Sequence, residues 1–338
     1  MVLGSGKIPM GYIQDLTFRL ARDDDSDAGQ FCQLFNSLYA RRVGPAYYRW
    51  QFFETPFPTL LAFATTPEGS LAGCYGTQLK EVLGGGKVGW ALDIMIAPQF
   101  QGRGLFRPLA GFAFEQLAAY GPSAICVMAN ARAERAHVKG LGWRLINGFR
   151  TFVCATALPS PAATGNRLEI QQVDRFEGAY SRLAEEGIPS PAELRTLATR
   201  RTPAYTDWRF VRSPWHRYQL FQVTRRYSPF GCLVLKVFRD PVAGHAFGDI
   251  VDISWAEGDQ EALATMIRFA LRQFQTQGVD QAAVWLQTNT ILDEVGQSIG
   301  FRGLEQTRYF CGKGLDAESR YFTDPQRWFL TMADVEIY

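Results

Sequence analysis

The chain has 338 residues, of which 47% are hydrophobic and 20% charged, a balance that excludes a disordered chain, a collagen and a coiled coil. A net charge of +2 gives no basic signature of nucleic-acid binding, so we expect no nucleic-acid partner. No apolar run reaches the ~20 residues of a membrane span, and the first dozen residues lack the apolar stretch of a signal peptide. We therefore expect a cytoplasmic protein with no membrane span.

The predicted elements of the first 158 residues follow apolar periodicity and turn signals. Phe31, Leu34, Phe35 and Leu38 form one helical stripe, and residues 124–129 form a wholly apolar strand. In chain order we predict a strand at 17–22, helices at 27–40 and 44–53, strands at 60–65, 71–83 and 88–97, a helix at 104–119, a strand at 124–129, a helix at 131–141 and strands within 145–157. This order predicts an α/β (α+β) fold with a mixed, mostly antiparallel sheet flanked by helices.

A repeat with an offset near 158 residues organises the whole chain. Trp50 matches Trp208, and Asp93 matches Asp252. The matched segments are 47–56 with 205–214, 92–94 with 251–253, and 142–144 with 300–302. They predict two copies of one fold: a domain at 1–158, a Pro- and Ala-rich linker at 159–166 and a second domain at 167–338. The copies should share one order of elements, and a single continuous sheet would contradict the duplication.

The most informative segment joins the strand at 88–97 to the helix at 104–119. It contains Gln101, Gly102 and Gly104 just before the helix start. Helix starts leave backbone N–H groups free, and glycines let the backbone close on an anion. The turn is therefore suited to a phosphate or pyrophosphate. Its spacing matches neither the dinucleotide nor the nucleoside-triphosphate fingerprint.

Together with its surroundings, this turn resembles the GNAT N-acyltransferase superfamily. The residues that carry the resemblance are Gln101, Gly104, the apolar strand at 124–129, Asn130, Ala133 and Gly142-Trp143. The resemblance covers the first copy, and the second copy resembles the same fold without the binding turn.

The resemblance implies a site for acetyl-CoA or another acyl-CoA. Backbone amides of the turn would bind the pyrophosphate of coenzyme A; the turn residues are Gln101, Gly102, Arg103, Gly104, Leu105 and Phe106. The strand residues Ile94, Met95 and Ile96 would pair with the pantetheine arm and direct an amide at the thioester carbonyl. Asn130 would bind the pantetheine or orient the neighbouring helix.

Two departures from the family pattern concern Phe106 and the proton donor. Phe106 stands where Gly or Ala is usual, and its side chain crowds the turn unless it points into the core. The family's tyrosine would fall at His137 or Val138, so the acid is His137, a water or nothing. The alternative for His137 is a partly exposed helical histidine without a catalytic role.

Asp93 is the candidate general base toward the incoming ammonium group. Its match in the second copy, Asp252, favours instead a structural role shared by both copies, such as capping or bonding across the sheet. Glu54 and Glu81 are further candidate bases. The duplicated Tyr-x-x-Trp-x-Phe segments are interpreted as structural.

The second copy has lost two residues from its turn, and its glycines are mostly replaced. The remaining segment carries Glu257, Asp259 and Glu261, whose charges suit a helix start but repel a pyrophosphate. The second copy should therefore bind no coenzyme A there and should form a wall of the acceptor cleft.

The chain's six cysteines include no CxxC pair, and its histidines number three, so no metal site is expected and the thiols should be free and buried. The sequence thus favours an N-acyltransferase, acting as a monomer or homodimer, that passes an acyl group from acyl-CoA to a primary amine of a small molecule, amino sugar or peptide by direct attack. The alternatives are a non-catalytic acyl-CoA-binding or scaffold protein and a Fem-type aminoacyl transferase.

Overall fold

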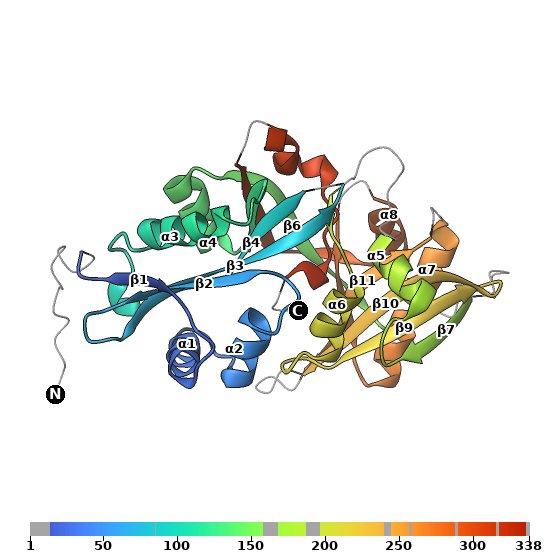
Figure 1. Ribbon diagram of the computed structural model, residues 1–338. Helices are drawn as coiled ribbons and strands as arrows, with labels where there is room; N and C mark the ends of the chain where they lie inside the picture. The colour runs from blue at the N-terminus through green and yellow to red at the C-terminus, as the bar shows by residue number, and fades with distance from the viewer. Residues whose placement is uncertain are drawn as a thin grey trace.

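One sheet connects the two halves of the chain (Figure 1). The computed structural model describes residues 14–84, 86–157, 168–186, 197–239, 245–256, 259–287, 290–315 and 318–335. Here the first half denotes the described residues 14–157 and the second half those from 168 to 335. The predicted linker at 159–166 lies outside the described residues, so the domain boundaries stay a prediction.

The first half contains the predicted elements in the predicted order. They are β1 (Thr17–Leu20), α1 (Asp25–Leu38), α2 (Pro45–Phe52), β2 (Thr59–Thr65), β3 (Leu71–Leu83), β4 (Lys87–Ile96), α3 (Phe106–Ala118), β5 (Ala124–Ala129), α4 (Ala131–Arg135) and β6 (Arg144–Ala155). A π-helical turn at Ala136–Gly140 extends α4. Figure 1 shows α3 and α4 on one face of this part of the sheet and α1 and α2 on the other.

The second half repeats this order, with one short extra strand, β8. Its elements are β7 (Leu168–Val173), α5 (Gly178–Glu186), β8 (Ala198–Thr199), α6 (Pro203–Thr206), β9 (Tyr218–Arg225), β10 (Ser228–Arg239), β11 (Ala246–Trp255), α7 (Gln260–Thr276), β12 (Gln281–Leu286), α8 (Ile291–Ile299) and β13 (Arg302–Gly314). Short 3-10 turns at Glu318–Thr323, Pro325–Arg327 and Met332–Asp334 follow.

The last strand of each half lies beside the other half's strands. The order across the sheet is β1-β2-β3-β4-β5-β13-β6-β12-β11-β10-β9-β7. Thus β13 pairs with β5, β6 pairs with β12, and the two exchanged strands pair with each other. The sheet is therefore continuous, which we had expected to contradict duplication. That criterion was wrong, because exchange of the last strands joins two sheets while each half keeps the repeated order.

The duplicated tryptophans meet where the two halves pack together. The Trp50 and Trp208 rings stack with centroids 4.7 Å apart. Each indole N–H donates to the other residue's carbonyl oxygen, at 2.9 Å from Trp50 and 2.8 Å from Trp208. This reciprocal contact satisfies both buried indole groups and explains why the motif occurs in both halves.

The C-terminal segment is held against the second half by a buried ion network. Arg201 contacts both carboxylate oxygens of Asp334 at 2.9 Å and one oxygen of Asp252 at 3.0 Å. Thr331 donates a 2.7 Å hydrogen bond to Asp252. Burial alone would raise the pKa of Asp334, but the charge and hydrogen bonds of Arg201 outweigh it, so the pKa is lowered.

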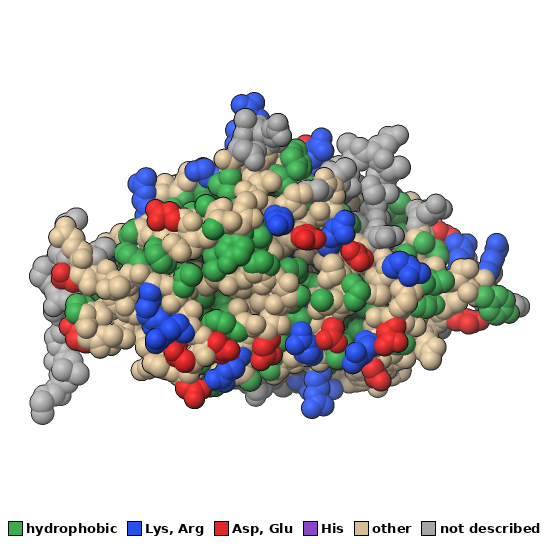
Figure 2. Space-filling model, in the orientation of Figure 1, with side chains coloured by type: hydrophobic (Ala, Val, Ile, Leu, Met, Phe, Trp, Pro, Cys, Tyr) green, Lys and Arg blue, Asp and Glu red, His purple; other side chains and the backbone are tan. Residues whose placement is uncertain are grey.

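The six cysteines are free and buried, as the sequence predicts. Within the described residues, no helix has the length and apolar character needed to cross a bilayer. Figure 2 shows one face of the molecule, on which positive and negative side chains are interspersed.

Candidate functional site

A β-bulge in β4 opens the sheet next to β5. The two strands pair in parallel from Val88/Ala124 to Ala91/Val127, where this ladder ends. Immediately afterwards the register against β3 shifts, and Asp93 adopts a positive φ of 44°. Such a bulge bends a strand and redirects its side chains and amides. Residues 94–96 consequently continue without β5 beside them.

The start of α3 faces this opening without a side-chain cap. Gly102 and Gly104 have φ of 72° and 88°, a conformation that favours glycine. Leu105 occupies the N-cap position and provides no side-chain hydrogen bond, and the first turn contains no acidic residue. Because the first amides of a helix carry partial positive charge, this end of α3 is suited to an anion.

Polar side chains fix the turn to its neighbours. The Gln101 amide donates to the Ile96 carbonyl at 2.7 Å and accepts from Arg132 at 2.7 Å. Asn130 caps α4, since its side-chain oxygen accepts from the amides of Arg132 and Ala133 at 3.0 and 2.9 Å. Asn130 therefore orients the helix, one of the two roles expected for it.

A pocket of about 520 Å³ lies between these elements. Its lining residues are Leu38, Tyr39, Ile94, Met95, Ile96, Phe100, Gln101, Gly102, Gly104, Leu105, Phe106, Asn130, Arg132, Ala133, Ala136 and His137. The structure thus brings together ten of the fourteen candidate catalytic and cofactor-binding residues proposed from the sequence. Arg103 and Asp93 do not line the pocket, although each adjoins residues that do. Glu54 and Glu81 are exposed and do not line it either.

Phe106 turns its ring away from the backbone turn. The ring lies 5.1 Å from the His137 ring and 6.1 Å from the Tyr75 ring, between centroids. The half-buried side chain therefore packs against the core and forms part of the pocket wall without filling the turn, which removes the steric objection raised by Phe at this position.

His137 is completely buried, so the expectation of a partly exposed histidine is wrong. Its Nδ1 lies 2.7 Å from the Ala133 carbonyl oxygen, which can only accept, so Nδ1 carries the proton. Nε2 then accepts from the Tyr75 hydroxyl at 3.0 Å. Burial lowers the pKa of His137 to about 4. A neutral imidazole with both nitrogens engaged is poorly placed to protonate a leaving thiolate, and its packing favours a structural role.

Asp93 sits at the edge of the pocket, half-buried, and accepts a 2.9 Å hydrogen bond from the Tyr47 hydroxyl. Asp252, its match in the second half, is instead bound to Arg201 and Thr331. The matched carboxylates thus have different partners, which weakens the argument that both serve one structural role.

Tyr39 lines the pocket and was not identified from the sequence. Tyr39 is 45% exposed; partial desolvation of its hydroxyl, and next the negative charge of Asp93, raise its pKa, so the hydroxyl keeps its proton at neutral pH. Tyr39 directly follows α1 in the chain, and no local sequence signal links it to a turn more than 60 residues away.

The corresponding helix start in the second half is closed. The Asp259 side chain accepts from the Ala262 amide at 2.9 Å and forms a 2.7 Å ion pair with Arg225. Glu261 adds a second acid to the first turn, while Glu257 lies outside the described residues. The carboxylate of Asp259 therefore occupies the position at which an anionic ligand would bind.

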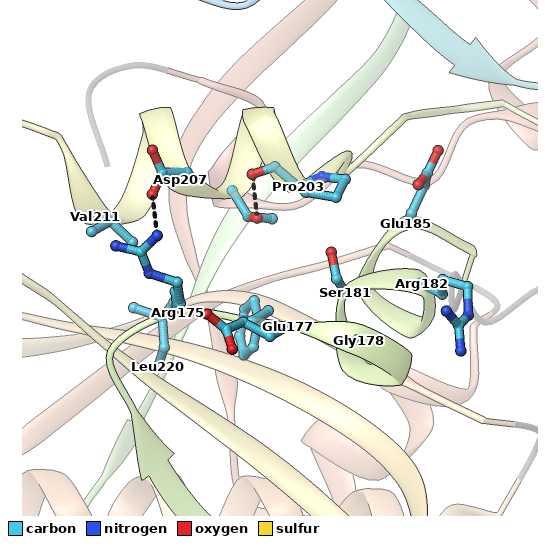
Figure 3. A pocket seen from close by; sticks show the side chains of 12 residues that line it. Arg175, Glu177, Gly178, Ser181, Arg182, Glu185, Pro203, Asp207, Val211 and Leu220 are labelled. Carbon is cyan, nitrogen blue, oxygen red and sulfur yellow. Dashed lines mark hydrogen bonds and ion pairs between the residues drawn. The ribbon is translucent and has the colours of Figure 1, made fainter.

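A second pocket, of about 510 Å³, lies elsewhere in the second half, between α5 and the segment 203–211 (Figure 3). Arg175, Arg182, Glu177, Glu185 and Asp207 give its wall a mixed charge. Arg175 is 3.9 Å from Asp207, and Glu185 pairs with Arg200 at 3.0 Å. Gly178, with a φ of 56°, lines this pocket at the start of α5, but no residue of α7 does, so the pocket does not duplicate the first site.

Several solved structures have a similar fold. A GCN5-related N-acetyltransferase from Anabaena variabilis ATCC 29413 matches with a TM-score of 0.66 and 12% identity over 90% of this chain and 74% of its own. A tandem GNAT protein from the clavulanic acid biosynthesis pathway matches with a TM-score of 0.64 and 14% identity over 88% and 98%. Saccharomyces cerevisiae N-myristoyltransferase with bound myristoyl-CoA gives 0.63 and 9% over 91% and 84%.

No protein-family model and no curated protein sequence matches the chain. At these low identities the likeness shows the fold alone. The chain therefore has the GNAT fold, in a tandem arrangement like that of the clavulanic acid pathway protein.

Proposed function

We propose that the first half binds acyl-CoA, with acetyl-CoA the simplest candidate, and transfers the acyl group to a primary amine. The observation that carries this proposal is the uncapped start of α3, which opens with Gly102 and Gly104 onto a pocket along a splayed strand. A pyrophosphate fits the helix start, and an extended thiol arm fits the strand that has lost its neighbour.

The local charge supports an anionic ligand at this position. Arg103 and Arg107 flank the start of α3, and Arg132 reaches the turn through Gln101. No acid lies in the first turn of α3. The corresponding turn in the second half has two acids, so the two helix starts differ in sign as well as in shape.

The reaction needs no covalent enzyme intermediate. The amine nitrogen attacks the thioester carbonyl, a C–N bond forms and the C–S bond breaks. The ammonium proton leaves to Asp93 or to water, and the thiolate takes up a proton to become the free thiol of coenzyme A. A backbone amide within 94–96 stabilises the developing oxyanion, and positioning supplies much of the remaining rate.

Calorimetric titration with CoA, acetyl-CoA and longer acyl-CoAs, followed by a CoA-release assay with an amine panel, tests the proposal. We expect binding of acetyl-CoA or a longer homologue and release of CoA that depends on an amine. Binding without turnover would favour the non-catalytic alternative, and no binding of any of these compounds would overturn the proposal.

A further inference from the structure

Arg41 lies between α1 and α2 and makes an unusual contact with the second half. Its guanidinium carbon is 3.4 Å from the centroid of the Trp215 ring. Its Nη2 lies 2.8 Å from His216 Nε2. Among the described residues no carboxylate pairs with Arg41, and its Nε and Nη1 atoms make no hydrogen bond. A guanidinium held over an indole face in this way keeps N–H donors for another group.

The surroundings of Arg41 are positively charged. Lys236 and Arg209 lie nearby; Lys236 pairs with Asp249 at 2.9 Å, whereas Arg209 contacts the Tyr218 hydroxyl and the Val335 carbonyl. Burial, and then the charges of Lys236, Arg41 and Arg209, lower the pKa of His216 to about 2. His216 is therefore neutral and accepts from Arg41, and it adds no negative charge.

Arg41 remains a cation despite this environment. Burial lowers the pKa of Arg41 to about 10, which still leaves the guanidinium charged at neutral pH. A partly buried cation that lacks a carboxylate partner gains stability when an anion binds.

A short series of contacts joins Arg41 to the acyl-CoA pocket. The Trp215 ring beneath Arg41 lies 4.3 Å from the Tyr47 ring, between centroids. The Tyr47 hydroxyl in turn donates to Asp93, at the bulge of β4. Tyr39, two residues before Arg41, lines the pocket itself. Arg41 is thus connected to Asp93 through Trp215 and Tyr47, and to the pocket through the neighbouring Tyr39.

The second half also has an arginine shortly before the corresponding helix, although the 158-residue offset aligns this Arg201 with Val43 and not with Arg41. Arg201, two residues before α6, binds the carboxylates of Asp252 and Asp334, whereas Arg41 lies four residues before α2 and has no such partner among the described residues. Within the described part of the chain, Arg201 thus has two carboxylate partners, whereas the side chains that contact Arg41 are an indole and a neutral imidazole.

We propose that Arg41, stacked on Trp215 and bonded to His216, binds an anionic group of the acceptor, a carboxylate or a phosphate, so that the acceptor is an amine that also carries an anion. This inference rests on the proposed function. With the anion at Arg41, the free amine of the acceptor points along Tyr47 toward Asp93.

The first experiment requires no turnover. Phenylglyoxal modifies accessible arginines, and peptide mass spectrometry measures the rate at each position. We expect glutamate or inorganic phosphate to slow modification of Arg41 at least threefold and to leave exposed Arg42 unchanged. Protection by glutamate alone indicates a carboxylate, and protection by phosphate alone indicates a phosphate. If neither anion protects Arg41, the inference is overturned, whatever the enzyme's activity.

The second experiment compares matched acceptors with acetyl-CoA saturating. Amino acids are compared with their uncharged amides, and aminoalkyl phosphates with amino alcohols. In Arg41→Met we expect KM for the anionic acceptor to rise more than about tenfold, with little change for its neutral twin and an unchanged Kd for acetyl-CoA. Arg42→Gln removes the same charge one residue away. It should leave KM for both acceptors and Kd for acetyl-CoA unchanged.

The outcomes separate the two proposals. If acetyl-CoA binds and neutral amines react as well as their anionic twins in the wild-type protein, the anion inference is wrong and the proposed function stands. If no acyl-CoA binds, the proposed function fails, while protection of Arg41 still reports on the anion site.

Discussion

The starts of α3 and α7 occupy the same place in the repeat and differ in almost every property that matters to an anion. The α3 start has two glycines with positive φ and no side-chain cap. The α7 start is capped by Asp259, which is also paired with Arg225. One fold can therefore present a binding site or a closed surface, depending on a few residues at one turn. A substitution in one half can therefore be compared with the matched substitution in the other half.

Gly104→Asp is the substitution with the largest expected effect on the difference between the two helix starts. The change puts a side chain at a φ of 88° and a negative charge beside the proposed pyrophosphate. At ~4 Å and an effective dielectric near 20, each like-charge pair costs about 4 kcal/mol before screening. We expect acyl-CoA affinity to fall more than a hundredfold by calorimetry, with the protein still folded.

Asp259→Asn is the matched control, because it removes a charge from the equivalent turn of the second half. It should leave acyl-CoA affinity unchanged. Unchanged acyl-CoA affinity in a folded Gly104→Asp protein would mean that the turn only connects β4 to α3 and does not bind the ligand. Weakened acyl-CoA affinity in Asp259→Asn would mean that the ligand binds the second half and not the first.

Asp93→Asn and Asp252→Asn test whether the matched carboxylates have diverged. If Asp93 accepts the ammonium proton, Asp93→Asn should lower kcat about a hundredfold. The substitution should change the stability of the protein little, because Asn tolerates positive φ. Asp252→Asn should lower the unfolding free energy by about 2 kcal/mol, because it weakens charged hydrogen bonds to Arg201 and Thr331. Steady-state kinetics and urea unfolding of both variants decide it; equal effects of the two changes would show one shared role.

His137→Val copies the second half, where Val295 stands at the same place in the repeat. The pKa of His137 is about 4 in the folded protein and near 6.5 when unfolded. The unfolded chain therefore takes up a proton first as the pH falls, and about 3 kcal/mol of stability present above pH 6.5 is lost by pH 4. Urea unfolding across this range should show a smaller loss in His137→Val than in the wild type.

At neutral pH the same variant should be about 1–3 kcal/mol less stable, since the buried Tyr75 hydroxyl loses its acceptor. We expect kcat to change less than about twofold. A fall of about a hundredfold with normal acyl-CoA affinity would instead identify His137 as the acid.

The smallest expected effect compares two helix caps. Asn130 caps α4, and Thr290 caps α8 through a 3.0 Å bond from the Asp293 amide. Replacing either with Ala should cost about 1 kcal/mol in thermal or urea unfolding. Only Asn130→Ala should also weaken acyl-CoA binding, and modestly. A large loss of affinity without a loss of stability would mean that Asn130 touches the ligand directly.

The sequence by itself determined the local structure of this protein. Apolar periodicity located the strands and helices of the first half to within a few residues, since it reflects which face of each element is buried. The glycine turn was recognisable because positive φ and free helix amides are local properties of the backbone. The repeat was visible because Trp50 and Trp208 make one reciprocal contact and so retain the same residue type.

Only the tertiary structure decided what depends on partners distant in the chain. Exchange of β6 and β13 follows from strand pairing between residues more than 120 positions apart, which no local pattern encodes. His137 is buried because Phe106 and Trp143 cover it, although its helical segment gave no sign of this. The contact of Arg41 with Trp215 likewise joins two halves of the repeat. Burial and electrostatic environment are set by whatever packs against a side chain, so they emerge only when the chain has folded.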